Sequence, residues 1–182
     1  DFEADVKDLN LPIKKNNNKI EKLSLVGTLK NHITSIETKN KDLILQLTED
    51  SVFLYAEDYA LHYSSIDSKK IENIKYKKID IKGKNLIIFY DEVNKLLADE
   101  FVLRIRNDSK FVSLDYKQTS VTFRESKDKK IDIFSNNVSD EFINALIGKH
   151  IFDGGNLMFY ASGYMNDLNG KLIIENCNIE NL

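Results

Sequence analysis

The residue types that most often carry out chemistry are few in this chain and lie far apart. His32, His62 and His150 are separated by long stretches, and Cys177 is the single cysteine. A metal centre needs His, Cys or carboxylate ligands that converge, and a reactive thiol needs a partner that lowers its pKa. The spacing therefore predicts no metal centre, no cofactor and no internal disulfide.

Paired acids are the next candidates for catalysis. They are Glu49-Asp50, Asp91-Glu92, Asp99-Glu100 and Asp140-Glu141. Adjacent residues of a strand point to opposite faces, and acids at turns or helix starts are solvated, so these pairs do not predict general acid–base catalysis. Gly154-Gly155 lacks the Lys-Ser/Thr that follows in a phosphate-binding loop. The chain is therefore predicted not to be an enzyme.

Composition narrows the class of protein further. The 182 residues are 42% apolar and 30% charged, with a net charge of −3. The apolar share predicts a packed fold, and the near-neutral charge argues against a nucleic-acid partner bound through bulk charge. The longest apolar runs fall far short of the roughly 20 residues of a membrane span. The sequence starts at Asp1 and shows no targeting segment, so we expect a processed product or a piece of a larger protein.

Apolar residues recur with a period of two along most of the chain, as in antiparallel strands. The runs include Leu43/Leu45/Leu47, Val52/Leu54/Ala56, Tyr59/Leu61/Tyr63, Ile79/Ile81, Leu86/Ile88/Tyr90, Phe101/Leu103/Ile105, Val121/Phe123, Ile131/Ile133, Leu157/Phe159/Ala161 and Leu172/Ile174. Polar turns separate them, at 48–50, 82–85, 106–109, 153–156 and 169–170. Asn169-Gly170 is the strongest hairpin signal, because both residues tolerate positive φ. We expect it to join strands at 156–163 and 171–176.

Only one segment has clear helix signals. Ser139 is a candidate N-cap, acidic residues follow it, and Gly148 stands where a C-terminal cap belongs. The segment 91–98 is ambiguous, because its apolar residues have helical spacing while both neighbours look like strand. The fold class predicted from these patterns is thus mainly β: an antiparallel sheet built of repeating hairpins, with one short helix near 139–147.

A weak internal repeat supports hairpin units. Lys41, Leu45, Ser51, Val52 and Tyr55 correspond to Lys110, Leu114, Ser120, Val121 and Arg124 at a constant offset. The domain layout expected is one β-rich unit over 1–182. It comprises an N-terminal strand and polar loop (1–22), a strand meander (23–137) with the repeat at 41–63 and 110–134, and a helix plus hairpin (138–182).

Several strands are apolar on both faces, which leaves two interpretations open. One is a closed core, as in a sandwich or a central strand covered on both sides. The other is a curved sheet with one face open toward lipid chains. In the second case residues two apart share a face and align across strands. The candidate groove residues are Leu43, Leu45, Leu47, Val52, Leu54, Ile79, Ile81, Leu86, Ile88, Phe101, Leu103 and Ile105.

The C-terminal segment 138–182 resembles a known family. A short helix (139–147) and Gly154-Gly155 precede an apolar strand (156–163), and the chain then reads Leu-Asn-Gly-Lys-Leu-Ile-Ile-Glu-Asn-Cys-Asn-Ile from Leu168 to Ile179. This arrangement resembles the C-terminal repeat of the AsmA-like superfamily of bacterial envelope proteins, and the upstream hairpins resemble its other repeats in style.

The resemblance implies a long curved antiparallel β-sheet, groove-like or taco-like in cross-section. It further implies a non-enzymatic module that holds phospholipid or other acyl-chain lipid in that hydrophobic groove on the way to the outer membrane. It also implies a periplasmic location within a larger protein anchored in the inner membrane, with outer-membrane partners reached through other parts. The alternative is a β-rich structural or protein-interaction module of the cell envelope or surface with a closed core.

Overall fold

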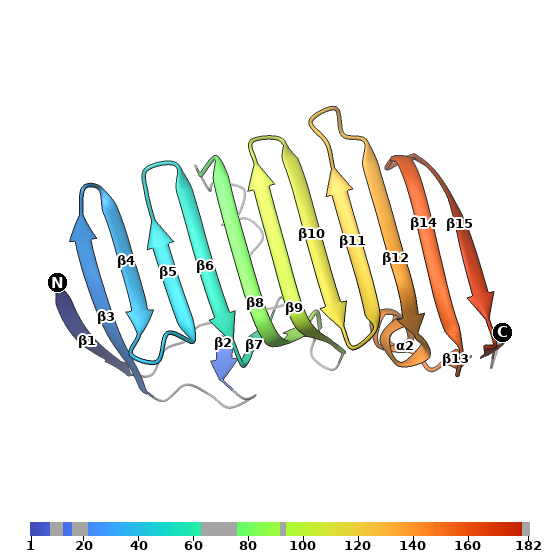
Figure 1. Cartoon of the computed structure of the whole chain (residues 1–182), viewed down its shortest axis with the longest axis horizontal. Helices are drawn as coiled ribbons and strands as arrows, with labels where there is room; N and C mark the ends of the chain where they lie inside the picture. The colour runs from blue at the N-terminus through green and yellow to red at the C-terminus, as the bar shows by residue number, and fades with distance from the viewer. Residues whose placement is uncertain (8–12, 16–21, 63–75, 92–93, 180–182) are drawn as a thin grey trace.

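The fold is dominated by one extended β-sheet (Figure 1). The computed structural model describes residues 1–7, 13–15, 22–62, 76–91 and 94–179. The strands are β1 (Phe2–Lys7), β2 (Ile13–Lys15), β3 (Lys22–Lys30), β4 (Ile33–Thr38), β5 (Leu43–Leu47), β6 (Ser51–Glu57), β7 (Tyr59–His62), β8 (Lys78–Phe89), β9 (Lys95–Arg106), β10 (Ser109–Tyr116), β11 (Thr119–Glu125), β12 (Ile131–Ser139), β13 (Phe152–Asp153), β14 (Asn156–Tyr164), β15 (Asp167–Glu175) and β16 (Asn178–Ile179). Helix α2 is Asp140–Ile147.

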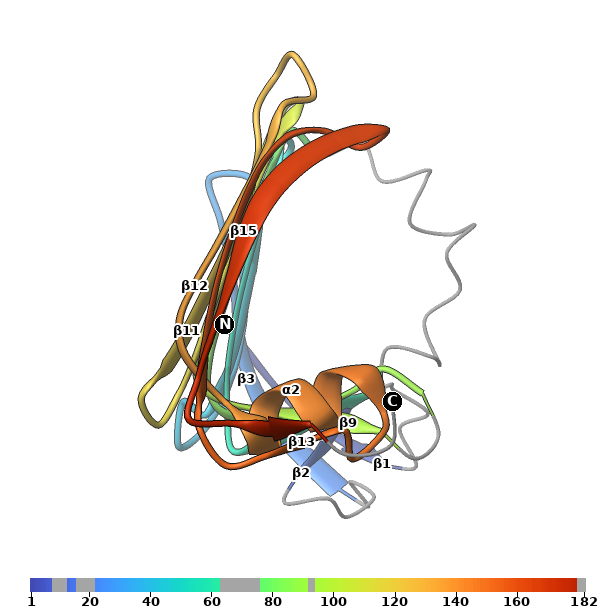
Figure 2. The same cartoon turned by 90° about the vertical axis from the view of Figure 1, so that its right-hand side faces the viewer.

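The sheet runs in the order β1-β3-β4-β5-β6-β8-β9-β10-β11-β12-β14-β15, while β13 and β16 form a separate small pair. Strands make up 71% of the structure, and the sheet does not close into a barrel. The predicted mainly β fold is therefore confirmed, with one short helix in the described part of the chain. Seen along its long axis, the sheet is curved and α2 lies within the curve (Figure 2). We call the face toward α2 the inner face and the opposite one the outer face.

The sheet is not an uninterrupted antiparallel meander, because β8 runs parallel to both β6 and β7. After β7 the chain returns to the start of β6, where the backbone N–H groups of Lys77 and Lys78 donate to the carbonyl of Asp50 at 2.9 and 3.0 Å. A strand that starts beside the start of β6 must run in the same direction. Tyr63, which was predicted to extend the strand that became β7, lies outside the described residues.

The sheet bends sharply at a corner that two neighbouring strand segments share. One bend lies between β6 and β7, and the other lies beside it, within β8. Asp58 and Asn85 both have positive φ, at 63° and 49°. Asn85 Nδ2 donates to Asp58 Oδ1 at 3.2 Å, and Asp58 N–H donates to the Lys84 carbonyl at 3.1 Å. Asx side chains tolerate this backbone region better than other residues do. Beyond the corner, β7, the end of β8 and the start of β9 pair with one another. They form a floor below the inner face, where Figure 2 labels β9.

The turn expected at 82–85 is therefore wrong. Lys84 pairs with Glu100 and Leu86 with Ala98, so pairing with β9 continues on both sides of Asn85. The Gly and Asn that signalled a reversal instead allow a bend. Gly83 gives room on the inner face, where a Cβ would meet the side chain of Leu86. Within the ambiguous segment 91–98, Asp91 accepts from Asn94 N–H at 2.6 Å and β9 begins at Lys95, while residues 92–93 lie outside the described residues.

A buried polar cluster fixes the strands beside the corner. The Tyr59 side chain, 2% exposed, donates through its hydroxyl to Asp42 Oδ1 at 3.3 Å, and Thr38 Oγ1 donates to the same oxygen at 2.6 Å. Asn40 Nδ2 reaches the other carboxylate oxygen at 2.7 Å. Buried polar groups destabilise a fold unless they are hydrogen-bonded, so this cluster specifies how the β4–β5 turn packs on β7.

The helix forms as its caps predict. Ser139 Oγ accepts from Phe142 N–H at 3.2 Å, and Gly148 has φ 67°, the left-handed conformation of a helix C-cap. In that conformation Gly148 N–H donates to the carbonyl of Ala145 at 3.3 Å. Both helix ends thus have partners for groups that the helix itself leaves unsatisfied.

The predicted hairpin turn at Asn169-Gly170 is wrong by four residues. The strands β14 and β15 reverse at Met165-Asn166, while Asn169 and Gly170 lie inside β15 opposite Ser162 and Ala161. The observed register pairs all nine residues of β14. A turn at 169–170 would have paired 171–176 with 163–168 and left Leu157 and Phe159 without these partners. The longer apolar overlap outweighs the local turn preference.

The corner yields a first prediction. Asn85→Val places a β-branched residue at positive φ and should lower the free energy of unfolding by about 1–2 kcal/mol, whereas Asn85→Gly should be tolerated. Urea unfolding of each variant measures this. Lys84→Val, at an exposed position of ordinary strand conformation, is the matched control. Equal stability of Asn85→Val and Lys84→Val would contradict the corner's dependence on that backbone conformation.

Candidate functional site

The inner face carries an apolar row that crosses the sheet from edge to edge. Cross-strand pairing joins, in order, Phe2, Gly27, Ile36, Leu45, Leu54, Ile81, Leu103, Val112, Phe123, Ile133, Ala161 and Gly170. Residues opposite one another in a ladder share a face, so all of these residues lie on the inner face. None of them has a charged or polar side chain.

The structure brings the sequence-predicted groove residues onto that same face. Leu45, Leu54, Ile81 and Leu103 belong to the row itself. Leu47, Val52, Ile79 and Ile105 form the neighbouring row on one side, and Leu43 and Phe101 share the row on the other side with Ala56 and Gly83. Leu86 and Ile88 lie past the corner, on the floor, opposite Ala98 and Leu96. That these residues hold lipid stays a prediction.

The positive φ of Asn85 explains why Leu86 and Ile88 face inward at all. Ile79, Ile81 and Gly83 are inner residues at odd numbers, so strict alternation would turn Leu86 and Ile88 outward. Both instead pack in or against the main apolar cluster with Ala98 and Leu96. The corner shifts the alternation by one residue, as any local break in a strand's period does.

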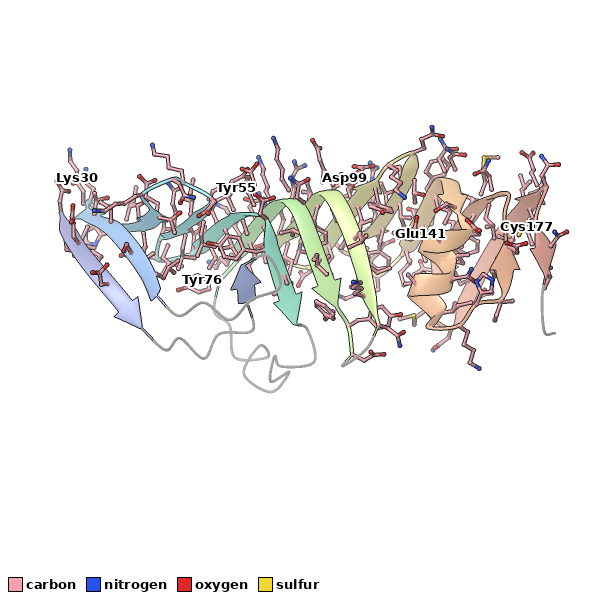
Figure 3. The ribbon with its side chains drawn as sticks, turned by 90° about the horizontal axis from the view of Figure 1, so that it is seen from below. Lys30, Tyr55, Tyr76, Asp99, Glu141 and Cys177 are labelled. Atoms are coloured by element: carbon pink, nitrogen blue, oxygen red, sulfur yellow. The ribbon has the colours of Figure 1, made fainter. Side chains whose placement is uncertain are left out.

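Most of the predicted groove residues are only partly covered. Of these twelve described residues, Leu86 is the one that is fully buried, at 5% exposed, and the others keep part of their surface accessible. The inner face is thus neither a dry closed core nor a fully exposed surface. Figure 3 shows the molecule from below. Helix α2, which carries the label Glu141, covers only the part of the sheet formed by the C-terminal strands.

Between α2 and the sheet lies an apolar pocket of about 500 Å³. The strands β11, β12, β14 and β15 form its wall and the helix its lid. Its lining is Val121, Ile133, Ser135, Val138, Phe142, Ile143, Leu146, Ile147, Phe152, Leu157, Phe159 and Leu172. The single polar side chain, Ser135, is satisfied by the backbone of Phe159, accepting at 2.9 Å and donating at 3.3 Å. Its volume lies in the range of small-molecule sites, and its lining suits an apolar ligand.

The sequence reasoning did not include these pocket residues among the site residues. The sequence shows the period-two runs that contain Val121, Ile133, Leu157, Phe159 and Leu172, and cross-strand register places them on the inner face with the groove residues. The missing information was the position of the helix, because only packing of Phe142 against Val138 and Leu157 reveals that α2 folds back onto the inner face.

Polar contacts hold α2 in place around the pocket. Asn144 accepts from the N–H groups of Ile151 and Phe152 at 2.9 and 3.0 Å and donates to the Phe152 carbonyl at 2.6 Å. The Tyr90 hydroxyl donates to the carbonyl of Ala145. Lys117 Nζ lies 2.8 Å from Glu141 Oε2, and this hydrogen bond raises the pKa of Lys117. The helix is therefore tied to the floor, to the β10–β11 turn and to the segment before β13.

The internal repeat coincides with two hairpins that run in opposite directions within the sheet. Leu45 and Val52 lie in β5 and β6, and the corresponding Leu114 and Val121 lie in β10 and β11. Leu45 and Val121 line the inner face, and the cross-strand register places Leu114 and Val52 there too. The repeat therefore preserves the inward apolar pattern.

Reactive groups do not converge in the described part of the chain. Among those residues there is no group of three His, Cys, Asp or Glu side chains that could hold a metal ion. The His32 side chain is 86% exposed, 4.0 Å from Glu49, and Cys177 is a free, partly exposed thiol. No helix in the described ranges is both long and apolar enough to span a membrane.

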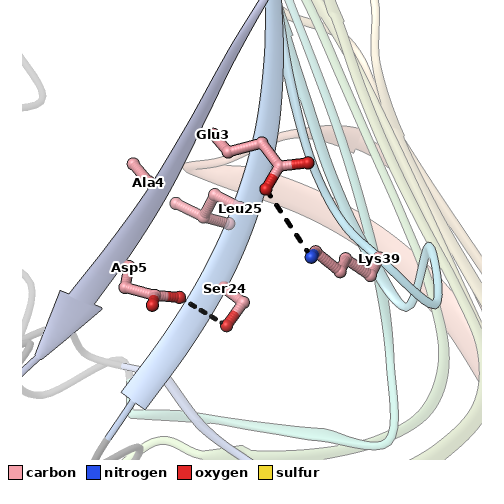
Figure 4. A pocket seen from close by; sticks show the side chains of 6 residues that line it. All are labelled: Glu3, Ala4, Asp5, Ser24, Leu25 and Lys39. Carbon is pink, nitrogen blue, oxygen red and sulfur yellow. Dashed lines mark hydrogen bonds and ion pairs between the residues drawn. The ribbon is translucent and has the colours of Figure 1, made fainter.

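A second, polar hollow of about 270 Å³ lies at the opposite edge of the sheet, between β1 and β3 (Figure 4). Its charged groups already have partners. Ser24 Oγ donates to Asp5 Oδ1 at 2.6 Å, and Lys39 Nζ lies 3.7 Å from Glu3 Oε2. The apolar pocket under α2 and the inner face that continues from it are therefore the stronger candidate site. Comparisons of the chain with family models, curated proteins and solved structures found no match.

The packing of α2 gives a second prediction. Phe142 is 5% exposed and fixes the helix to the sheet. Phe142→Ala should lower the free energy of unfolding by about 3 kcal/mol in urea titrations. Leu146→Ala, on the same helix but 47% exposed, should cost about 1 kcal/mol or less. Equal losses would mean that Phe142 does not anchor the helix.

A pH prediction follows from the helix start. Hydrogen bonds from the N–H of Gly154, at 2.8 Å, and then of Glu141 lower the pKa of Asp140. A carboxyl group with a lowered folded-state pKa stabilises the fold above its ordinary pKa of about 4 and loses that contribution as pH falls through the folded value. Asp140→Asn should therefore lower Tm at pH 7 and lower it less at pH 3.

Asp153→Asn is the control for this comparison, since Asp153 is exposed and close in sequence to the same glycines. Its Tm should differ little from wild type at pH 7. A Tm difference for Asp140→Asn that is the same at both pH values would contradict the role of the Asp140 charge.

Proposed function

We propose that this chain is a non-enzymatic lipid-binding module in which acyl chains lie against the inner face and enter the pocket under α2. The observation that carries the proposal is the apolar row that runs along the main path of the sheet from β1 to β15 without a charged side chain. A fold that only needs a core has no requirement for an apolar surface that reaches both sheet edges and stays partly exposed.

The dimensions suit a lipid chain. The path from β1 to β15 has eleven strand-to-strand steps, which at roughly 4.8 Å each extend about 50 Å. One leaflet of a bilayer's hydrocarbon core is about 15 Å thick. The row is therefore several acyl-chain lengths long, and each CH₂ removed from water contributes about 0.8 kcal/mol.

The pocket under α2 offers the deepest position along this path. Its lining is almost entirely apolar, with Leu172 of the edge strand β15 52% exposed at its open side. A chain terminus placed there would be enclosed by Phe142, Leu157 and Phe159, whereas the middle of the sheet covers a chain from one side only. Binding should therefore be tightest at this end.

The wider setting is proposed from the resemblance of residues 138–182 to the AsmA-like superfamily. In that setting the module is periplasmic, belongs to a protein anchored in the inner membrane, and passes phospholipid toward outer-membrane partners. The displaced hairpin turn, at 165–166, alters one detail of the repeat pattern on which the resemblance rests.

A lipid-binding assay tests the proposal with a matched pair on one strand. Leu45 faces inward and its neighbour Gln46 faces outward. Leu45→Asp should weaken binding of a fluorescent phospholipid at least about tenfold, since it places a charge in the apolar row, while Gln46→Asp should bind as wild type does. Leu172→Gln, at a half-exposed position of the pocket, should weaken binding without unfolding the protein.

Circular dichroism of each variant separates binding from folding. If wild type binds no lipid, or if folded Leu45→Asp and Leu172→Gln both bind as wild type does, the proposal fails. If Leu45→Asp unfolds while Leu172→Gln stays folded and binds normally, the inner face is a core, as in a structural or protein-interaction module.

A further inference from the structure

The outer face carries an arginine–aromatic patch that the lipid-binding proposal does not use. Arg104, Arg106 and Arg124 are the only arginines among 26 basic residues, and all three lie at this patch. The other basic positions are lysines, which provide charge equally well. Arginine provides in addition a planar fork of donors and a surface that stacks on aromatic rings.

Cross-strand register builds the patch. Asp80, Arg104, Phe111, Arg124 and Asp132 lie opposite one another on β8, β9, β10, β11 and β12. The guanidinium groups of Arg104 and Arg124 lie 5.7 and 5.4 Å from the centroid of the Phe111 ring. Phe111 thus has a cation on either neighbouring strand.

The three arginines differ in what they bind. Arg106 Nη2 donates to both carboxylate oxygens of Asp80, at 2.7 and 2.6 Å. Arg104 Nε lies 4.0 Å from Oδ1 of the same carboxylate. Asp132, opposite Arg124, instead accepts from Ser162 Oγ at 2.6 Å. Among the described residues Arg124 makes a cation–π contact and no ion pair, so its fork remains available to a carboxylate.

Exposed apolar side chains continue the patch on the same face. Phe134 and Tyr160 lie opposite each other on β12 and β14, and each is 52% exposed. Met158, two residues from Tyr160, is 38% exposed. We define the outer patch as Arg104, Arg106, Phe111, Arg124, Phe134, Met158 and Tyr160. Arg, Phe, Tyr and Met are the residue types that enrich the centres of protein interfaces.

We propose that the outer patch binds a short acidic protein segment, with its carboxylates on Arg124 and Arg104 and an apolar side chain against Phe134 and Tyr160. Charge complementarity argues for an acidic partner, since the patch gathers all the arginines of a chain whose net charge is −3. From β9 to β14 the patch spans four strand steps, or roughly 20 Å. That width fits one short segment better than a globular partner.

A membrane surface is the less suitable occupant. Stable attraction to anionic lipid takes clusters of about four to eight basic residues. Here the patch holds three arginines, and one of them, Arg106, is already paired with Asp80. Exposed aromatic rings beside a planar donor fork favour a protein ligand of defined geometry.

The test uses two blocked peptides and three variants of the full chain. The acidic probe is Glu-Tyr-Glu-Gly-Glu, and its charge-reversed partner is Lys-Tyr-Lys-Gly-Lys. We expect the acidic probe to bind with Kd below about 1 mM and to shift the NMR signals of the Arg104 and Arg124 side chains. Arg124→Lys and Arg104→Lys keep the charge but remove the fork, so each should weaken binding by about fivefold. Lys30→Ala, at the exposed end of β3, should not.

Several results would overturn the proposal. They are no binding of the acidic probe, equal binding of the basic probe, or binding that the arginine variants leave unchanged. In those cases the ladder only stabilises the sheet. Arginine-dependent sedimentation with vesicles of phosphatidylserine and phosphatidylcholine, without binding of the acidic peptide, would assign the patch to a membrane instead. Lipid binding at the inner face is measured separately, so the two proposals can fail independently.

Discussion

Cross-strand register is the constraint on which the rest of the structure depends. The side-chain period of a strand is two, so a slip of one residue on any strand would turn its apolar residues to the other face. The pairing Leu45–Leu54–Ile81–Leu103 is preserved across an antiparallel pair, a parallel pair and another antiparallel pair. Each step keeps the apolar surface continuous on the inner face, and the same register gathers Arg104, Phe111 and Arg124 on the outer face. The two faces are therefore products of one set of backbone hydrogen bonds.

The corner at Asp58 and Asn85 makes the sheet into a trough rather than a plain curved surface. Without it, Leu86 and Ile88 would face outward and the sheet would have no floor. The backbone conformation needed there is one that few residue types adopt easily, and Asp and Asn satisfy it while bonding to each other across the strands. The buried Tyr59–Asp42–Thr38 cluster lies directly beside this corner. Local strain and buried hydrogen bonds thus act at the same place to set the shape of the inner face.

Helix α2 gives the trough its unequal ends. Around the edge of the helix, polar contacts attach it to the rest of the fold, through Asn144, Asp140 and the Lys117–Glu141 ion pair. At its centre, the apolar side chain of Phe142 packs in the core cluster. This division leaves the space between helix and sheet lined by side chains that make no hydrogen bonds, apart from Ser135. The opposite edge, at β1, carries a hollow lined mostly by partnered polar groups. Because Phe2 and Ala4 face inward on β1 while Glu3, Asp5 and Ser24 face outward, that polar hollow lies on the outer face. An apolar ligand along the inner face would therefore meet an enclosed apolar end at α2 and, at β1, an end that no helix of the described residues covers.

Local patterns in the sequence determined much of this. The alternation in Leu43–Leu47 or Phe101–Ile105 specifies strands and which residues share a face, because the period of a strand is a local property. The caps Ser139 and Gly148 specify the helix for the same reason. Local patterns failed where long-range pairing outweighed them. Gly83 and Asn85 look like a turn but lie in a bent strand, and Asn169-Gly170 lies within β15 because nine paired residues are worth more than one favourable turn. The parallel return to β8, the position of α2 over the inner face and the meeting of three arginines were decided only by tertiary structure. Each depends on segments far apart in the chain coming together, and no local period encodes that contact.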